Sequence, residues 1–414
     1  MNKNKKICIL LGAHLCRAPR SVKEANALSK AGYEVVVLAP FLESKLVQED
    51  TRLTANRNWV RKAPVDLRRG KNNLVFSFYY RVKRKIAQLL HPYFKFLTPH
   101  FLGYGLNTML KAAIREKADL YIGHQEVGLW LTYQLQEKGF KVGVDIEDWY
   151  SKQRIEEKKQ SLSSKYLEYL EGQMLRKSSF SLTTSKILAE ELAAYYGAPA
   201  PAIIYNTFPF FDRQKIDHKF LDRPSNQERT SLFWFSQTIG LDRGLDTLFM
   251  ALTYVSIPVE VHLRGKISDS TKHQLINLFP VEKGHTLYFH HLVSPKELLS
   301  RIAEHDIGLA LEKSHTASRA YSITNKFFQY LIGGLPILAT ETEGQLEIAA
   351  QLPEVVYTFP EDNAAKLGAS INYLLEQPGV LEQAKKQAVQ AAEKYFSWER
   401  QIPVLQKVVQ QVLL

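Results

Sequence analysis

The stretch Ser322–Thr340, SITNKFFQYLIGGLPILAT, predicts a turn, a short helix and a buried strand. Asn325 is a suitable N-cap, and the residues after it give the helix an apolar face. Gly333 and Gly334 follow where a helix commonly ends in a left-handed residue. The apolar run that begins at Pro336 is typical of a core strand, since proline is tolerated only near the start of one. A loop that enters a helix directs backbone N–H groups and a positive dipole end toward one point, so the stretch predicts a diphosphate site.

The same alternation of strand and helix extends through the chain and predicts a parallel α/β sheet in each half. Strands are expected at residues 7–11, 34–39, 119–123, 141–144, 181–184 and 202–205, and again at 232–236, 259–264, 286–290, 307–311, 336–339 and 355–358. Helices are expected at residues 20–30, 106–116, 130–137, 163–177, 245–253, 295–305, 325–331, 346–351, 364–377 and 397–414, with Ser185 as the cap of a further one. Residues 41–100 are basic and aromatic without a clear period, and we expect inserted helices there.

A polar segment at 211–230 has no hydrophobic periodicity and predicts a linker between two domains. It would separate an N-terminal Rossmann-like domain at 1–210 from a C-terminal one at 231–395. The helix at 396–414 is expected to cross back to the N-terminal domain. Ligands of such sheets bind at the carboxyl ends of the strands, so candidate site residues are sought there.

Length and composition are those of a globular protein, with 414 residues and a net charge of +12. The two cysteines, Cys8 and Cys16, exclude a disulfide framework and have no zinc-site spacing. The N-terminus resembles a signal peptide, but His14 and Arg17 stand where small cleavage-site residues belong, so a first strand is the better interpretation. No apolar run is long enough to span a bilayer. We therefore expect a cytoplasmic protein.

The segment Arg61–Lys95 concentrates positive charge and holds one acid, Asp66. Its basic residues are Arg61, Lys62, Arg68, Arg69, Lys71, Arg81, Lys83, Arg84, Lys85 and Lys95. Aromatic residues lie between them, which is typical of a segment that docks on an anionic membrane. A solvated basic helix face remains the alternative. Nucleic acid is not expected as a partner, because no nucleic-acid-binding module accompanies the segment.

The order of residues in the first stretch resembles the nucleotide-sugar motif of the GT-B glycosyltransferases, in particular the retaining family 4. The matching positions are Ser322, Asn325, Lys326, Phe328, Tyr330, Gly334, Pro336, Ala339 and Thr340. Gln329 stands where that family usually has glutamate. The resemblance covers nearly the whole chain. It implies the GT-B fold, in which two Rossmann-like domains face a central cleft, with the donor on the second domain and the acceptor on the first.

On the donor side, the segment 235–248, FSQTIGLDRGLDTL, resembles the family's opening of the second domain. Arg243 takes the place of the family's lysine, and Thr238 that of its arginine. The resemblance implies that Arg243 and Lys326 neutralise the diphosphate during catalysis, since arginine can hold phosphate oxygens in a bidentate manner. The further donor contacts that it implies are Ser236, Gly265, Glu312, Asn325 and Gln329.

On the acceptor side, the segments 118–128 and 141–151 resemble the family's cleft segments in the first domain. His124 matches a family histidine, and a neutral imidazole there would bind a sugar hydroxyl or a phosphate. A histidine bonded to the backbone at a strand end is the alternative. The acceptor residues implied by the resemblance are Gly12, Arg20, Asp145, Glu147 and Asp148.

These acceptor-side assignments carry their own alternatives. Glu147 stands where the family has a histidine, and Arg20 could instead be a surface arginine. Mutual repulsion is expected to raise the pKa values of the carboxyl groups at 145–148. Three carboxylates in four residues also permit a Mg²⁺ site, but no metal is expected, because this fold neutralises phosphate with side chains and helix dipoles.

The resulting hypothesis is a retaining transfer of sugar from a nucleoside-diphosphate sugar, UDP- or GDP-linked, to a hydroxyl of a glycan or lipid-linked acceptor. We place it in bacterial cell-surface polysaccharide synthesis, at the inner face of the plasma membrane, without a cofactor. The replacements at Thr238, Glu147 and Gln329 keep a catalytically inactive, sugar-nucleotide-binding or scaffold relative open. A nucleotide-sugar epimerase is the third possibility. A dinucleotide enzyme is disfavoured, because Gly12 is the only glycine in the first turn.

Overall fold

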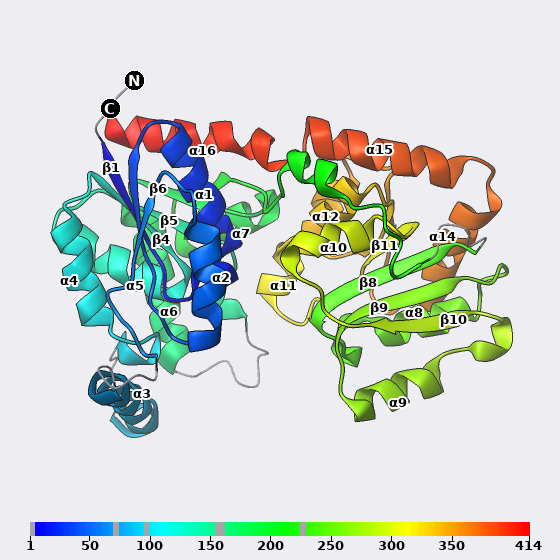
Figure 1. Cartoon of the computed structure of the whole chain (residues 1–414), viewed down its shortest axis with the longest axis horizontal. Coiled ribbons are helices and arrows are strands. Elements are labelled where there is room, and N and C mark those ends of the chain that lie inside the picture. Colours follow the sequence, from blue (N-terminus) through cyan, green and yellow to red (C-terminus); the bar gives the residue numbers. More distant parts are fainter. Residues whose placement is uncertain (1–4, 69–73, 95–98, 154–161, 224–228) are drawn as a thin grey trace. The chain divides into compact units, whose positions relative to one another are not determined.

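The computed structural model describes residues 5–68, 74–94, 99–153, 162–223 and 229–414. The chain divides into two compact units (Figure 1). Unit 1 comprises residues 1–204 together with 402–414, and unit 2 comprises residues 205–401. Each unit has its own sheet and its own core, and each is described by itself below.

Unit 1 is built on a seven-stranded parallel sheet in the order β3-β2-β1-β4-β5-β6-β7. Its strands are β1 (Lys6–Leu10), β2 (Glu34–Leu38), β3 (Val60–Lys62), β4 (Leu120–His124), β5 (Val142–Ile146), β6 (Phe180–Thr183) and β7 (Ala202–Ile203). Its helices are α1 (Pro19–Lys30), α2 (Ser44–Thr54), α3 (Leu74–Phe94), α4 (Leu106–Glu116), α5 (Gln125–Gln136), α6 (Leu162–Lys177) and α7 (Lys186–Tyr196). The helix α16 (Trp398–Leu413) contributes its residues from 402 onward.

Both faces of the unit 1 sheet are buried, as the apolar runs of its strands predict. Cys8 and Leu10 of β1 face one layer of helices, where they join a core with Met109 of α4 and Trp130 of α5. Ile9 points to the opposite face, because side chains alternate along a strand, and it is equally inaccessible. Helices lie on both sides of this sheet in Figure 1.

Unit 2 is built on a six-stranded parallel sheet in the order β10-β9-β8-β11-β12-β13. Its strands are β8 (Ser231–Thr238), β9 (Glu260–Lys266), β10 (Thr286–His290), β11 (Ile307–Ala310), β12 (Ile337–Thr340) and β13 (Val356–Phe359). Its helices are α8 (Leu245–Leu252), α9 (Asp269–Leu278), α10 (Pro295–Ile302), α11 (Ala317–Tyr321), α12 (Asn325–Gly333), α13 (Glu343–Ala349), α14 (Ala364–Glu376) and α15 (Val380–Lys394). Trp234 and its neighbours on β8 alternate between two separate cores, one on each face.

The strand order reverses at the same place in both units. In unit 1 the chain leaves β1 toward β2 on one side and returns to β4 on the other. In unit 2 the same relation holds for β8, β9 and β11. Ligands of doubly wound sheets bind outside the carboxyl ends of the strands at this switch point. The predicted α/β architecture of two Rossmann-like domains is confirmed, and most predicted elements lie within a few residues of their expected bounds.

The predicted cap of α12 is wrong by one residue. Thr324 is the N-cap, with an extended backbone at φ −62° and ψ 138°, and Asn325 is the first helical residue. The amide of Phe327 donates to the Thr324 carbonyl at 3.0 Å, which fixes the start of the helix there. Gly334 is the left-handed C-cap, as predicted.

The predicted linker is also displaced, because the boundary between the units falls between Ile204 and Tyr205. The described part of 211–230 packs on unit 2, where the amide of Asp217 donates to Ser300 Oγ at 3.1 Å. Arg301 pairs with the Asp217 carboxylate at 2.6 Å. The amides of Leu221 and Asp222 donate to Glu304. The polarity of this segment therefore serves hydrogen bonds within unit 2.

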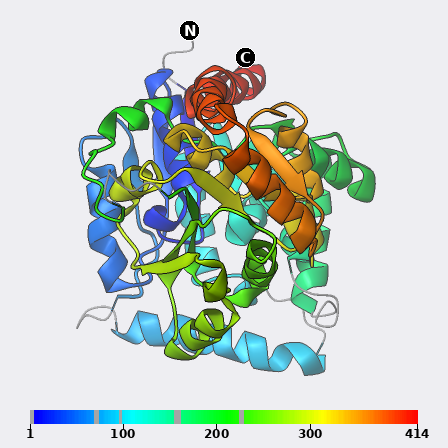
Figure 2. The same ribbon diagram turned by 90° about the vertical axis from the view of Figure 1, so that its right-hand side faces the viewer.

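Figures 1 and 2 show α3 as one continuous helix at the periphery of unit 1. Within the described residues, no helix combines the length and the apolar character needed to cross a membrane.

Candidate active site

The predicted donor cations meet at one carboxylate in unit 2. Glu312 follows β11, Lys326 is the second residue of α12, and Arg243 ends the short helix η6 (Leu241–Arg243) ahead of α8. Lys326 Nζ donates to Glu312 Oε1 at 2.8 Å. Arg243 Nη1 donates to both oxygens of Glu312, at 3.2 and 2.9 Å. We call Arg243, Glu312 and Lys326 the donor triad.

Burial and the neighbouring charges act in opposite directions on the pKa values of Glu312 and Lys326. Glu312 and Lys326 are 9% and 6% exposed, whereas the side chain of Arg243 is 30% exposed. Burial alone would raise the pKa of Glu312, but Lys326 and Arg243 outweigh it, and the pKa is lowered. Burial lowers the pKa of Lys326, and the attraction of Glu312 offsets only part of that effect. Glu312 was predicted as a donor contact, yet both of its oxygens already accept hydrogen bonds from cations.

The other predicted donor residues lie on α12 and on the strands β8 and β9 of the same unit. Asn325 is exposed at the first turn of α12, and Gln329 is half-buried one turn later on the same helix face. Ser236 is half-buried near the end of β8. A side chain at Gly265 on β9 would place its Cβ 2.8 Å from the Ser236 carbonyl oxygen. The neighbouring strand therefore requires this glycine, whether or not a ligand lies nearby.

The acceptor-side residues form a buried charged cluster in unit 1. Arg20 on α1 donates through Nε to Asp145 Oδ2 at 2.5 Å and through Nη1 to the Ile204 carbonyl at 2.6 Å. His124 Nε2 lies 3.0 Å from Glu24 Oε2, and its Nδ1 lies 3.5 Å from Glu147 Oε1. Arg20, Glu24, His124 and Asp145 are all inaccessible to solvent. The surface-arginine alternative is wrong, because Arg20 is inaccessible to solvent, and its role toward an acceptor stays a prediction.

The protonation of His124 differs from the prediction of a neutral imidazole. Burial would lower the pKa of His124, but Glu24, Glu147 and Asp145 outweigh it and raise the pKa to about 10. The ring is therefore an imidazolium held between carboxylates. Burial raises the pKa of Glu24 to about 7, against the attraction of His124.

Asp145, near the end of β5, has a lowered pKa despite its acidic neighbours. Burial would raise the pKa of Asp145, but Arg20 and His124 outweigh it, and the pKa is lowered. The expected raising by mutual repulsion is wrong for Asp145, because a guanidinium lies against it. Glu147, with 21% of its side chain exposed, and Asp148, which is half-buried, remain the acidic side chains of this segment that solvent reaches.

Gly12 follows β1 with no room for a side chain. A Cβ at this position would lie 2.5 Å from Val127 on α5. The family resemblance implies that Gly12 lies on the acceptor side, and its packing against α5 is by itself a sufficient reason for glycine.

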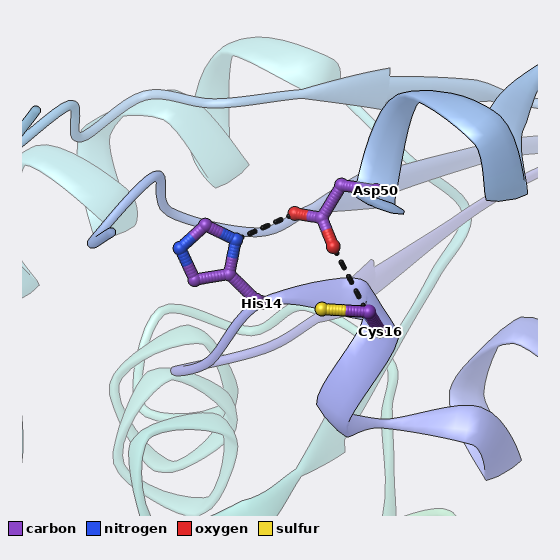
Figure 3. Close-up of side chains that lie close together, drawn as sticks. All are labelled: His14, Cys16 and Asp50. Carbon is purple, nitrogen blue, oxygen red and sulfur yellow. Dashed lines mark hydrogen bonds and ion pairs between the residues drawn. The ribbon is translucent and has the colours of Figure 1, made fainter. Parts of the chain in front are cut away.

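Two groups of side chains in the described residues have the composition of a metal site. The first is His14, Cys16 and Asp50 (Figure 3). The amides of Leu42 and Glu43 both donate to His14 Nε2 at 2.9 Å, so the ring proton lies on Nδ1 and is donated to Asp50 Oδ2 at 2.7 Å. No lone pair is left on the ring for a cation. These hydrogen bonds instead hold the turn after β1 against α2.

The second group is Glu24, His124 and Asp145. The Arg20 guanidinium contacts Asp145 and already supplies the positive charge that a metal would bring. The expectation from the sequence that no metal is used stays a prediction.

Sequence reasoning missed Glu24, although a signal for it exists. Glu24 lies four residues after Arg20, which places both on one face of α1, and their side chains are 3.6 Å apart. It also missed Trp234, whose ring centroid is 5.5 Å from Lys326 Nζ. That contact joins residues far apart in the sequence and has no local signal.

Known proteins are similar to this chain in part of its sequence and in its fold. The model of the family Glycosyltransferase Family 4 matches residues 22–208. A sequence search of curated proteins finds no match. Several solved structures share the fold over the whole chain, at identities too low to show more than the fold.

One of them is a sucrose-phosphate synthase from Thermosynechococcus elongatus, with 14% identity, a TM-score of 0.68 and 99% of each chain covered. Another is HepE of Anabaena in complex with UDP, with 13% identity, a TM-score of 0.65 and the same coverage. A glycosyltransferase from Rickettsia africae has 12% identity and a TM-score of 0.66, with 100% of this chain and 99% of that one covered. Residues 22–208, somewhat less than half of the chain, are thus similar to Glycosyltransferase Family 4. The two parallel sheets and these solved structures show that the whole chain has the GT-B fold.

Proposed function

We propose that the chain transfers a sugar, with retention of configuration, from a nucleoside-diphosphate sugar to a hydroxyl of a glycan or lipid-linked acceptor. The observation that carries the proposal is the meeting of Arg243 and Lys326 at the start of α12, beside the carboxyl ends of the strands of unit 2. A nucleoside diphosphate leaves as an anion, so cations and backbone N–H groups at that place would stabilise the growing charge. The shared fold with a protein solved in complex with UDP supports a nucleotide donor.

In this proposal the departing phosphate accepts the proton of the acceptor hydroxyl, so no protein base is assigned. Unit 1 binds the acceptor, with Glu147 and Asp148 as the carboxylates that solvent reaches near the charged cluster. The buried members of that cluster would hold the segment in place.

The test begins with the binding of UDP-, GDP- and ADP-sugars, measured as a thermal shift, because a ligand of the folded state adds stability. Release of nucleoside diphosphate is then measured with and without candidate acceptors. Arg243→Ala should lose about 2–4 kcal/mol of transition-state stabilisation, the scale of one lost electrostatic contact. Lys272→Ala on α9 is a control at an exposed lysine of the same unit. Unchanged kinetics in Arg243→Ala would remove Arg243 from the site.

We further propose that α3 docks unit 1 on an anionic membrane and so brings the enzyme to a lipid-linked acceptor, as polysaccharide synthesis at the membrane would require. The helix exposes large apolar side chains that a solvated helix would normally bury. Val75, Phe78, Tyr79, Ile86 and Leu89 are 80%, 70%, 53%, 48% and 60% exposed. Their spacing of three, four and seven residues places them along one face of the helix.

Basic side chains accompany that face, since Arg81 and Lys85 are exposed on α3. An apolar stripe beside basic residues is the pattern of a helix that lies in a membrane interface. The earlier part of the basic segment contributes less, because its cations are paired. Arg61 lies 3.2 Å from Asp50, Lys62 lies 2.7 Å from Glu116 and Arg68 lies 2.5 Å from Asp66. Arg69, Lys71 and Lys95 lie outside the described residues.

A sugar-nucleotide-binding protein without turnover is the second candidate. The observation that favours it is that His124 is inaccessible to solvent and lies within an ion cluster. Donor binding without release of nucleoside diphosphate, across an acceptor panel, would support this candidate over transfer.

A further inference from the structure

We propose that Glu312 is a positioning residue of the donor site, which keeps Lys326 charged and holds Arg243 beside it before a diphosphate binds. The inference rests on the proposed function and assigns Glu312 a role other than donor contact. One oxygen of Glu312, Oε1, accepts hydrogen bonds from both Lys326 Nζ and Arg243 Nη1, at 2.8 and 3.2 Å.

Glu312 is itself held in a fixed place. Its amide donates to Thr340 Oγ1 at 3.2 Å, which ties the segment after β11 to the end of β12. The side chain is nearly excluded from solvent. A carboxylate fixed in this way can define where two flexible cationic side chains lie.

Lys326 is the member of the triad that depends on this carboxylate. The groups around it are Glu312 after β11, Arg243 on η6, Arg319 on α11 and the Trp234 ring on β8. Two of these groups are cations, and Asp242 pairs with both of them, Arg243 and Arg319, each at 3.9 Å. Burial and both arginines favour the neutral amine, and Glu312 opposes them. Arg243 needs no such help, because a guanidinium stays charged in proteins.

Removal of the carboxylate should therefore remove a cation from the site as the pH rises. In Glu312→Gln the amide cannot stabilise the ammonium as a carboxylate does, so Lys326 should lose its proton at a lower pH. The donor diphosphate would then meet one cation where the wild type offers two.

The first measurement needs no nucleotide. The side chain of Lys326 is followed by NMR in lysine-labelled protein between pH 6.5 and 9.5, with the signal assigned by its absence in Lys326→Arg. We expect the wild-type ammonium to persist beyond pH 8, and the titration midpoint in Glu312→Gln to move down by about one pH unit or more. A wild-type Lys326 that is already neutral at pH 8 would overturn the proposal, even if the variant does not fold.

The second measurement is the affinity for UDP and GDP by calorimetry over the same pH range. We expect a nearly constant affinity in the wild type, and a loss of about tenfold in Glu312→Gln as Lys326 loses its charge. Glu312→Gln combined with Lys326→Arg should restore the flat profile, because arginine stays charged. Asp242→Asn is the matched control, since it removes an exposed acid that touches Arg243 and leaves Lys326 paired.

The two measurements separate this inference from the proposed function. A wild type that binds neither nucleotide would contradict the proposed donor, and the NMR titration would still decide the role of Glu312. Nucleotide binding with a flat profile in Glu312→Gln, together with an unmoved Lys326 titration, would overturn the inference and leave the proposed donor site intact.

Discussion

The charge of the buried Arg20 side chain is compensated by its ion pair with Asp145. Its guanidinium is fully buried, with Asp145 at 2.5 Å and the Ile204 carbonyl at 2.6 Å. The removal of one partner from a buried ion pair leaves an uncompensated charge, which costs about 3–5 kcal/mol. Arg20→Met should therefore lower the free energy of unfolding by about that amount in urea denaturation.

Arg115→Met, at an exposed arginine of α4, is the control and should change stability little. Combining Arg20→Met with Asp145→Asn should recover part of the loss, because the two substitutions act on one interaction. If Arg20→Met kept full stability but lost acceptor-dependent turnover, Arg20 would be a ligand contact, as the family resemblance implies.

Glu171 on α6 is a buried acid whose partners are neutral donors. The Tyr196 hydroxyl donates to it at 2.6 Å and the Ser151 amide at 3.1 Å. Burial raises its pKa from 4.5 to about 7, despite these hydrogen bonds. The folded state thus binds more protons than the unfolded state between these two values. Stability should fall as the pH rises through this window, and the cost should be complete above about pH 7.

Glu171→Gln should remove this dependence, with the amide oxygen accepting from the Ser151 amide and the amide NH2 donating to the Tyr196 hydroxyl oxygen. At pH 8 the variant should be more stable than the wild type by about 1–3 kcal/mol, the scale of the pKa change, and the difference should vanish near pH 4.5. Thermal unfolding at a series of pH values measures it, with Glu190→Gln on α7 as an exposed control. A variant that is less stable at every pH would show that the ionised Glu171 carboxylate stabilises the folded protein.

At the scale of elements, the sequence predicts what local patterns encode and misses what distant contacts decide. The strands other than β3 were predicted, because apolar runs bounded by turns have few other interpretations, whereas β3 has the polar sequence VRK. α15 was missed because its buried face consists of Ala384, Ala388, Ala391 and Ala392, which give a weak apolar signal. α2 lies within residues 41–100, where inserted helices were expected, but its bounds could not be predicted, because it buries only Leu46 and Asp50 and the burial of Asp50 depends on His14 and Arg61.

The candidate site follows the same division. The residues at strand ends and helix starts could be named from the sequence, because the carboxyl edge of a parallel sheet is where ligands bind. The ion pairs and hydrogen bonds between these residues could not be predicted from the sequence. Glu312 meets Arg243 across 69 positions of the chain, and His124 meets Glu24 across 100. Such contacts determine whether a predicted ligand residue is accessible to solvent, whether it is charged and whether it is already paired. The prediction of a neutral His124 was wrong because its contact with Glu24 was not visible in the sequence.

At the scale of the whole molecule, one strand order occurs twice without a sequence repeat. Both sheets run 3-2-1-4-5-6 in their own numbering, and unit 1 adds a seventh strand. What differs is the outer surface. Unit 1 carries α3, whose exposed apolar stripe and basic side chains are not needed for the sheet. A segment that adds exposed apolar surface to a stable fold calls for a partner that covers it.

The membrane hypothesis makes that partner an anionic bilayer, and liposome flotation tests it. Each basic residue near such a surface contributes about 1 kcal/mol, screened by salt. The wild type should float with anionic vesicles at low salt, less at high salt, and little with neutral vesicles. Arg81→Glu with Lys85→Glu should abolish flotation. Lys272→Glu with Lys283→Glu, at exposed lysines of unit 2, makes the same change in net charge and should leave it intact. Equal flotation with neutral and anionic vesicles, or equal loss in both double variants, would contradict an electrostatic dock at α3, and a soluble glycan would then be the better acceptor.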